Sequence, residues 1–388
     1  MARSKSGRIV VEVDPNIKRN LYANLAGDET TLKAWFTRVA EEYCSNGGYL
    51  FEKKILVDEP FLPSDLKCVD KSYQTVSMFS GCGGMDLGFR GGFNIFRRYY
   101  PKLPFDIVWA NDLNDAACRT YRKNLGNEIR CGDIWELLDS MPSRADVLIG
   151  GFPCQDISIN GKGAGVAGKR SGLYRAMVEA VKRLRPSIFI AENVKGLLLK
   201  SREESLKRVI DDFKALNYNL SLQLYKAVDY GVPQMRERVF IVGTPAGYHP
   251  FTPPHPERNP DTWMTSEEAI GDFIDLPEDA NFNHVWSRAA KSPEQGSRII
   301  SAHKPAHTIR AECHGNIQFH YSLPRRLSMR EAARIQTFPD DFIFDSKLRE
   351  TERQIGNAVP PVLAWHIAKA SLRALRSGKI NFAESATA

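Results

Sequence analysis

A short apolar run that ends in two glycines, a proline and a cysteine places the strongest constraint on the fold. Residues 147–149 read Val-Leu-Ile, the pattern of a buried strand in a parallel sheet. Gly150 and Gly151 break this pattern, and Pro153 fixes φ just before Cys154. We therefore expect Cys154 on a loop at the carboxyl end of a strand, where α/β sheets bind ligands. A buried structural thiol is the alternative, since free cysteine is often buried.

A second apolar run ends in an acid. Residues 187–191 read Ser-Ile-Phe-Ile-Ala, and Glu192 follows them directly. A thiol nucleophile and a carboxyl group at the ends of two neighbouring strands can face one substrate. The sequence therefore favours a joint site that contains Cys154 and Glu192.

The two runs also carry a family resemblance. GGFPCQ at 150–155 and ENV at 192–194 resemble the catalytic motifs of DNA (cytosine-5)-methyltransferases, and further motifs follow in that family's order over residues 73–370. The resemblance implies an α/β fold, Rossmann-like and S-adenosylmethionine-dependent, with a mostly parallel doubly wound sheet. It also implies a smaller target-recognition domain.

A glycine-rich turn follows the strand expected at 74–79. Glycines let the backbone approach a ligand closely, but the turn has neither the Lys-Ser/Thr of a P-loop nor a full GxGxxG. The next strand ends at Asp112, where a carboxylate can meet ribose hydroxyls or cap a helix. An aromatic residue often follows this acid in the family, and here Leu113 stands there. The resemblance assigns cofactor contacts to Phe79, Gly81, Cys82, Gly84, Asp112, Asp133, Ile134, Pro153, Leu173 and Asn357.

The motif QMRER at 234–238 matches the family's QxRxR motif. Arg236 and Arg238 alternate along an expected strand, so both should face one side, toward a bound anion or toward surface carboxylates. The resemblance makes Cys154, Glu192, Arg236 and Arg238 catalytic. Cys154 would attack carbon 6 of cytosine, Glu192 would hold or protonate ring nitrogen 3, and the arginines would stabilise the carbonyl oxygen.

Residues 244–326 change in character, from proline-rich and acidic to basic beyond His284. A basic, loop-rich segment between motifs is where the family places its target-recognition region. Residues 306–310 resemble the Thr-Ile/Leu element found there, and the glycine-rich stretch 159–172 resembles the loop that closes over a flipped base. We expect DNA contacts from Gln155, Ser158, Thr308 and Arg310.

The first residues have the pattern of a separate small unit. A strand near 8–13 and two amphipathic helices resemble a ribbon-helix-helix fold, which would dimerise and bind DNA; a helical extension packed on the main domain is the alternative. We divide the chain into this unit (1–47), a connector (48–72), a catalytic domain (73–243), a target-recognition region (244–326), and a support helix with the C-terminal return to the catalytic domain (327–388).

Composition excludes several other classes. No apolar run reaches membrane-span length, and the N-terminus is polar and basic rather than a signal peptide. Seven cysteines without a close CxxC pair argue against a disulfide scaffold and a zinc site, so we expect a reducing cytoplasm and no metal. A net charge of +7 is compatible with a polyanionic partner.

We therefore expect a sequence-specific DNA cytosine-5 methyltransferase that acts on double-stranded DNA in the nucleoid. It would flip out its target cytosine, form a covalent Cys adduct and serve a restriction-modification system or act alone. Two alternatives stay open: an RNA methyltransferase on the same core, and a DNA-binding regulator with an idle core. The recognised DNA sequence depends on loop side chains that the sequence does not place.

Overall fold

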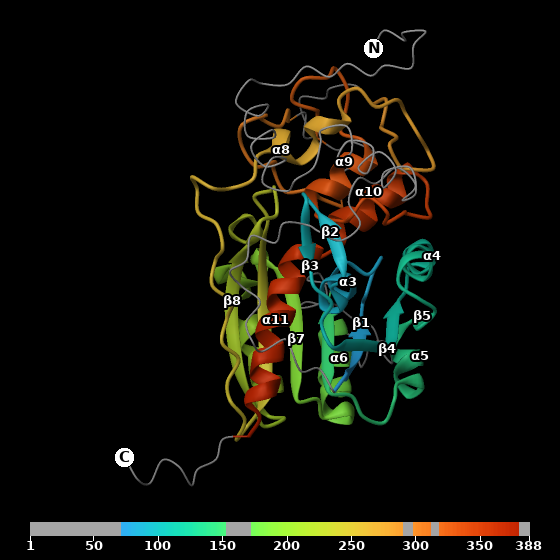
Figure 1. Ribbon diagram of the computed structural model, residues 1–388. Coiled ribbons are helices and arrows are strands. Elements are labelled where there is room, and N and C mark those ends of the chain that lie inside the picture. The colour runs from blue at the N-terminus through green and yellow to red at the C-terminus, as the bar shows by residue number, and fades with distance from the viewer. Residues whose placement is uncertain (1–70, 153–171, 290–297, 312–317, 380–388) are drawn as a thin grey trace, which may run out of the picture. The chain divides into compact units, whose positions relative to one another are not determined.

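The centre of the protein is a seven-stranded sheet with the strand order β5-β4-β1-β6-β7-β9-β8 (Figure 1). The computed structural model describes residues 71–152, 172–289, 298–311 and 318–379, so the predicted unit at 1–47 lies outside the described residues. The strands of this sheet are β1 (Tyr73–Met78), β4 (Phe105–Asp112), β5 (Ile129–Cys131), β6 (Val147–Gly151), β7 (Ile188–Val194), β8 (Tyr218–Lys226) and β9 (Glu237–Pro245).

Strands β5, β4, β1, β6 and β7 run parallel, and β9 is antiparallel to both β7 and β8. The chain builds the sheet outward from β1 in one direction and then, from β6, in the other. This reversal between β1 and β6 is a topological switch point, and open α/β sheets bind ligands beside such a point, at the carboxyl ends of their strands. The prediction of a mostly parallel, Rossmann-like sheet is confirmed.

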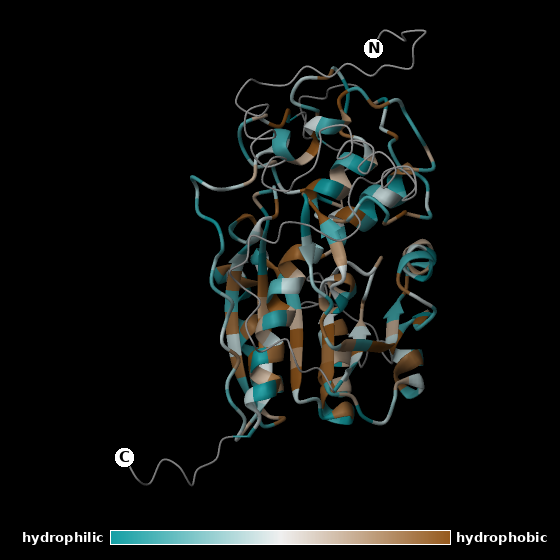
Figure 2. Cartoon of the chain, viewed as in Figure 1, coloured by the Kyte–Doolittle hydropathy of each residue, from teal (hydrophilic) through white to brown (hydrophobic). Residues whose placement is uncertain are grey.

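Neighbouring residues of the central strands alternate between two cores. Leu148 and Phe189 belong to one hydrophobic cluster, whereas Ile149 and Ile190 belong to the other. Because successive strand side chains point to opposite faces, the sheet is buried on both sides. The central strands are accordingly apolar along their length in Figure 2.

Helices cover both faces of this sheet. The cluster that contains Ile149 and Ile190 also contains residues of α3 and α11. The cluster that contains Leu148 and Phe189 also contains residues of α6 and α7. The helices are α3 (Gly84–Arg90), α4 (Asp115–Asn124), α5 (Ile134–Leu137), α6 (Leu173–Leu184), α7 (Glu203–Lys214), α8 (Ser266–Ile270), α9 (Met329–Ile335), α10 (Leu348–Asn357) and α11 (Pro361–Ser377).

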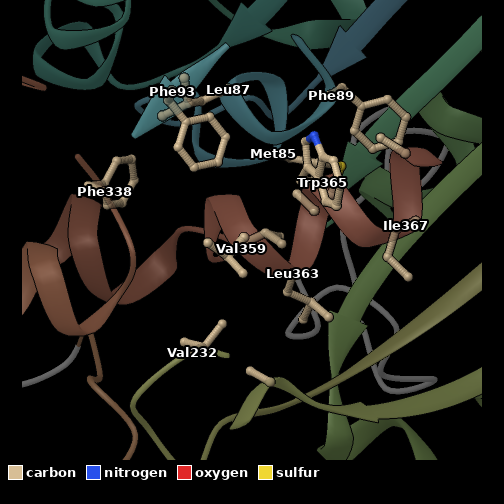
Figure 3. Close-up of a cluster of buried hydrophobic side chains, with 14 of the residues drawn as sticks. Met85, Leu87, Phe89, Phe93, Val232, Phe338, Val359, Leu363, Trp365 and Ile367 are labelled. Atoms are coloured by element: carbon tan, nitrogen blue, oxygen red, sulfur yellow. The ribbon is translucent and has the colours of Figure 1, made fainter. Parts of the chain in front are cut away.

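The last helix packs against the first helix of the sheet domain. Met85 and Phe89 of α3 meet Leu363 and Trp365 of α11 in one buried cluster (Figure 3). A Cβ atom at Gly88 would lie 2.4 Å from the Ala364 Cβ. Only glycine permits this approach, so α11 packs closely on α3.

Local sequence signals locate several of these elements. Ser328 and Glu331 form a capping box at the start of α9, and Thr265 and Glu268 form one at the start of α8. The hairpin of β2 (Phe93–Ile95) and β3 (Arg98–Tyr100) was not predicted, since no glycine marks its turn. In the described part of the chain, no helix is long and apolar enough to cross a membrane.

Candidate active site

The carboxyl ends of β6 and β7 bring two predicted motifs together. Gly151 is the register partner of Glu192 in the β6–β7 ladder, and a Cβ atom on it would lie 2.8 Å from Glu192 Oε2. Asn193 donates a 2.9 Å hydrogen bond to the Phe152 carbonyl. Glycine therefore leaves room for the carboxylate, and Asn193 fixes the chain just before the PCQ motif.

Four of the predicted residues lie beyond this point. The expected nucleophile and its neighbours fall in a segment outside the described residues, so their approach to Glu192 stays a prediction. These residues are Pro153, Cys154, Gln155 and Ser158.

Glu192 and Arg238 form an ion pair at this edge. Arg238 Nε lies 2.8 Å from Glu192 Oε1, and both side chains are about nine-tenths buried. Val194 pairs with Arg238 in the β7–β9 ladder, which fixes the relative positions of the two strands. Burial raises the pKa of Glu192, and the positive charges of Arg238 and Arg236 oppose that rise. Burial therefore favours the protonated carboxyl group, whereas the ion pair with Arg238 favours the carboxylate.

Arg236 has a different environment from Arg238. Strand β9 begins at Glu237, so Arg236 lies just before the strand on which both arginines were expected, although its charge still acts on Glu192. The chain before β9 bonds to the expected recognition region, with Met235 N donating to the Ala306 carbonyl at 2.8 Å. The Arg236 guanidinium is fully buried and donates to backbone carbonyls rather than to Glu192.

The glycine-rich turn after β1 meets the acid that ends β4. Gly81 N donates to Asp112 Oδ2 and Asn114 N donates to Asp112 Oδ1, both at 2.8 Å. Asn114 is the N-cap of α4, so the alternative of Asp112 as a helix cap is wrong. Burial raises the pKa of Asp112, and these N–H bonds oppose the rise. Each carboxylate oxygen keeps a lone pair that can accept a hydroxyl group.

Several other predicted cofactor residues gather around this carboxylate. Phe79 has a φ of 55°, which turns the chain at the end of β1, and the space beside Gly81 is open. Gly132 N donates to the Asp112 carbonyl at 3.0 Å and brings Asp133 and Ile134 to the same edge. Asp133 caps α5 through Trp135 N, and Ile134 is buried.

The remaining predicted cofactor residues differ in exposure. Cys82 is buried with a raised pKa, owing chiefly to that burial, and faces the Gln354 carbonyl. Gly84 packs on the Val359 carbonyl, where a Cβ would lie at 2.5 Å. Leu173 begins α6, and Asn357 ends α10 with an exposed side chain. Among these predicted cofactor residues, Asn357 can therefore present its side chain to a ligand, whereas the buried Cys82 cannot.

Of the predicted DNA contacts, Thr308 lies against the QMRER motif at 234–238. Its hydroxyl donates to the Met235 carbonyl at 2.6 Å, and Arg310 is exposed two residues later. The structure therefore attaches the expected recognition element directly to the residues that precede β9.

Several basic residues of the recognition region are already engaged. Arg325 forms two hydrogen bonds to Glu331 at 2.7 and 2.8 Å, and Arg288 pairs with Glu278 at 2.7 Å. Glu278 and Glu331 lie outside the basic stretch that begins at His284. The composition of that stretch alone therefore predicts more unpaired positive charge than the structure has. Among the described residues, no three His, Cys, Asp or Glu side chains come together in a way that could hold a metal ion.

Comparisons with known proteins agree with this geometry. The family model for C-5 cytosine-specific DNA methylases matches residues 73–298 and 280–373. The type II methyltransferase M.NgoFVII of Neisseria gonorrhoeae is 35% identical over 347 residues, covering 80% of this chain and 89% of its own. M.FnuDI of Fusobacterium nucleatum is 33% identical over 329 residues, covering 76% and 92%.

A solved structure is similar in fold. The S. pombe Dnmt2 methyltransferase superposes with a TM-score of 0.58 at 17% identity, covering 78% of this chain and 99% of its own. At this identity the likeness supports the architecture alone.

Proposed function

The chain belongs to the C-5 cytosine-specific DNA methylase family, and on that premise we propose that it methylates carbon 5 of a flipped-out cytosine within a specific sequence of double-stranded DNA. S-adenosylmethionine is the proposed methyl donor. The observation that carries the proposal is the Glu192–Arg238 ion pair, which lies beside the β6 end that leads into Cys154.

The chemistry needs a nucleophile because carbon 5 of cytosine is too weakly nucleophilic by itself. The Cys154 thiolate would form a bond to carbon 6, and the electron pair of the 5,6 double bond would make carbon 5 enamine-like. Glu192 would donate a proton or hydrogen bond to ring nitrogen 3, and Arg238 would stabilise the carbonyl oxygen. Carbon 5 would then form a bond to the methyl group, and the sulfonium sulfur that carried it would leave as a neutral thioether. Loss of the carbon-5 proton to a base would re-form the 5,6 double bond and expel the thiolate.

The turn after β1 and the ends of β4 and β5 would hold the cofactor. Asp112 has lone pairs available for ribose hydroxyls, and the open space over Gly81 admits a ligand against the backbone. The exposed Leu113 offers an apolar surface beside Asp112. When bound there, S-adenosylmethionine supplies an electrophilic methyl group.

The curated relatives are named type II methyltransferases, which supports the role of modification methylase, with or without a partner endonuclease. We place this activity in the cytoplasm, at the nucleoid. Residues 1–47 would add contacts to DNA or to a second copy of the chain.

A mechanism-based trap tests the covalent step. In a duplex with 5-fluorocytosine at the target, attack and methyl transfer can occur, but carbon 5 carries no proton to lose, so the adduct should persist. We expect a denaturation-resistant protein–DNA complex that requires S-adenosylmethionine and is absent for Cys154→Ala. An equal complex with Cys154→Ala would contradict the assignment of Cys154, and unsubstituted duplex is the control.

A further inference from the structure

Three buried polar side chains form a network next to the catalytic pair. Gln234, Arg236 and Gln336 are each fully buried, and we call them the buried network. The Gln234 amide oxygen accepts from Ile309 N at 3.1 Å. Its amide nitrogen donates to Gln336 Oε1 at 2.5 Å and to the Ile335 carbonyl at 3.0 Å. One side chain thus joins the recognition region to the end of α9.

Arg236 extends the network to a further segment. Its guanidinium donates to the Ile309 carbonyl at 2.9 Å and to the Gly356 and Ala358 carbonyls at 2.8 Å each. Gln336 also donates to the Ala358 carbonyl, at 2.5 Å. The buried network therefore connects the catalytic motif with residues 306–311, which we call the recognition segment, and with both neighbours of Asn357.

The packing around this network leaves little room for adjustment. A Cβ atom at Gly356 would lie 2.3 Å from Ala311 N and 2.4 Å from the Arg310 carbonyl carbon. The recognition segment thus lies directly on the backbone of residue 356. Thr308 adds its bond to the Met235 carbonyl. The segment is held from two sides, and a shift in either support would move Thr308 and Arg310.

Stability alone does not account for a buried guanidinium here. A charge removed from water is costly unless hydrogen bonds compensate, and among the described residues Arg236 Nε has no partner. Burial lowers the pKa of Arg236, which reflects that cost. Apolar side chains of similar volume often replace such groups without loss of stability. A planar fork with several donors is instead suited to fixing several carbonyls at once.

We propose that Gln234, Arg236 and Gln336 are positioning residues that hold the recognition segment in fixed register with Glu192 and Arg238. Contacts of Thr308 and Arg310 with the correct DNA sequence then set the target cytosine against the Glu192 carboxyl group. The three side chains act through these neighbours and do not touch the substrate. The inference rests on the proposed function and adds how sequence recognition is coupled to catalysis.

Arg236 has a second, electrostatic effect on the same site. Its charge opposes the rise in the pKa of Glu192, although its hydrogen bonds go to carbonyls. Removal of the charge should raise that pKa further, so that Glu192 stays protonated to higher pH. A residue that served packing alone would leave the pH profile of the enzyme unchanged.

The test compares Arg236→Met, Arg236→Lys and Gln336→Met in the full chain. Gln223→Met is the matched control, since Gln223 is an exposed glutamine on β8. The readouts are kcat and KM on the DNA site mapped for the wild type, the same values on DNA with one base pair changed, and the pH dependence of kcat. Circular dichroism checks that each variant is folded.

We expect Arg236→Met and Gln336→Met to lower kcat on the correct site by about tenfold to a hundredfold, since small misplacements cost this much. In both variants, the ratio of kcat/KM on the correct site to kcat/KM on the changed site should be smaller than in the wild type. Arg236→Met alone should extend activity to higher pH. Arg236→Lys should restore the pH profile but not the full rate, because lysine keeps the charge and loses the fork. Gln223→Met should match the wild type.

Wild-type kcat, site preference and pH profile in folded Arg236→Met and Gln336→Met would overturn the proposal. If either variant fails to fold, Arg236→Lys decides: a wild-type rate and preference overturn the proposal, and a reduced rate at an unchanged pH profile supports it. Failure of the proposed function is distinguishable, because the wild type itself would then place no methyl group on cytosine.

Discussion

At the scale of single residues, Glu192 carries the most direct consequence of the site geometry. Glu192→Gln should lower methyl transfer about a hundredfold to ten-thousandfold, the usual contribution of a positioned acid. The fold should survive, since a neutral amide can still accept from Arg238 Nε. Single-turnover methylation measures the loss. The matched control is Glu237→Gln, which removes a surface pair with Lys195; an unaffected rate in Glu192→Gln would contradict the assignment.

A buried acid beneath the glycine-rich turn gives a second prediction at this scale. Burial raises the pKa of Asp86 to about 6, and Tyr121 donates to its Oδ1 at 2.9 Å. A folded-state pKa above the unfolded one means that the contribution of Asp86 to stability increases as pH falls from about 6 toward 4 and is least favourable at neutral pH.

Asp86→Asn should therefore be more stable than the wild type at pH 7.5, by up to about 3 kcal/mol. The advantage should shrink at pH 5, where the wild-type carboxyl group is largely protonated. Urea unfolding at the two pH values tests this. Lower stability of the variant at pH 7.5 would show that the hydrogen bond from Tyr121 needs the charge.

Motifs in the sequence indicated Glu192 and Arg238 but not the partners of Arg236. Its acceptors are backbone carbonyls of residues 309, 356 and 358, and any residue type supplies a carbonyl. Gln234 and Gln336 were passed over for a similar reason, since their bonds join segments far apart in the chain. Such contacts leave no spacing pattern, so only the fold shows them.

At the scale of elements, the contact between α3 and α11 can be tested directly. Gly88→Ala should destabilise the protein by about 1–3 kcal/mol, because its Cβ would overlap the Pro361 carbonyl and the Ala364 side chain. Gly196→Ala is the control, since its Cβ would meet only an ordinary contact of 3.7 Å. Thermal unfolding compares the two, and equal melting temperatures would contradict the tight contact.

Elements with a clear period or a cap were predictable, and the others were not. Apolar runs located β6 and β7 to within a residue, and the spacing of Ser328 and Glu331 is that of a capping box, which marks the start of α9. Helix α10 was missed because it buries polar residues such as Glu352 and Gln354, which hides the apolar face. Burial of polar groups depends on partners elsewhere, and local patterns do not contain them.

At the scale of the whole molecule, pH acts on His366, a buried histidine of α11. Burial lowers the pKa of His366 to about 4, although Glu257 Oε1 lies 3.6 Å from Nδ1. A folded-state pKa below the unfolded one means that the contribution of His366 to stability is fully present above a pH of about 6.5 and is lost as pH falls toward 4. Burial lowers the pKa of His284 and His320 in the same direction.

His366→Phe should therefore lose less stability than the wild type between pH 7.5 and pH 5, by about 2 kcal/mol. Phenylalanine keeps an aromatic ring next to Tyr230 and Trp365. Denaturant unfolding at both pH values gives the difference, with the exposed His303→Asn as the control. An equal loss in His366→Phe and the wild type would show that other groups dominate.

The arrangement of the whole molecule follows from the sequence only in part. The order of motifs indicated a sheet domain followed by a recognition region, and the sheet is as expected. The way the recognition segment attaches to the catalytic motif was not predictable, because it depends on the Gln234–Ala306 bridge and on three buried side chains. The basic composition of the recognition region also predicted more free positive charge than the structure has, because Glu278 pairs with Arg288 and Glu331 pairs with Arg325.

The central claim is the transfer of a methyl group to carbon 5 of cytosine, and one measurement tests it most directly. Labelled S-adenosylmethionine is incubated with mixed-sequence duplex DNA and either the wild type or Cys154→Ala, with RNA as a parallel substrate. The account predicts label in 5-methylcytosine of the DNA, absent for Cys154→Ala. Label in RNA alone, label on another base or atom, or label that persists in Cys154→Ala would contradict it.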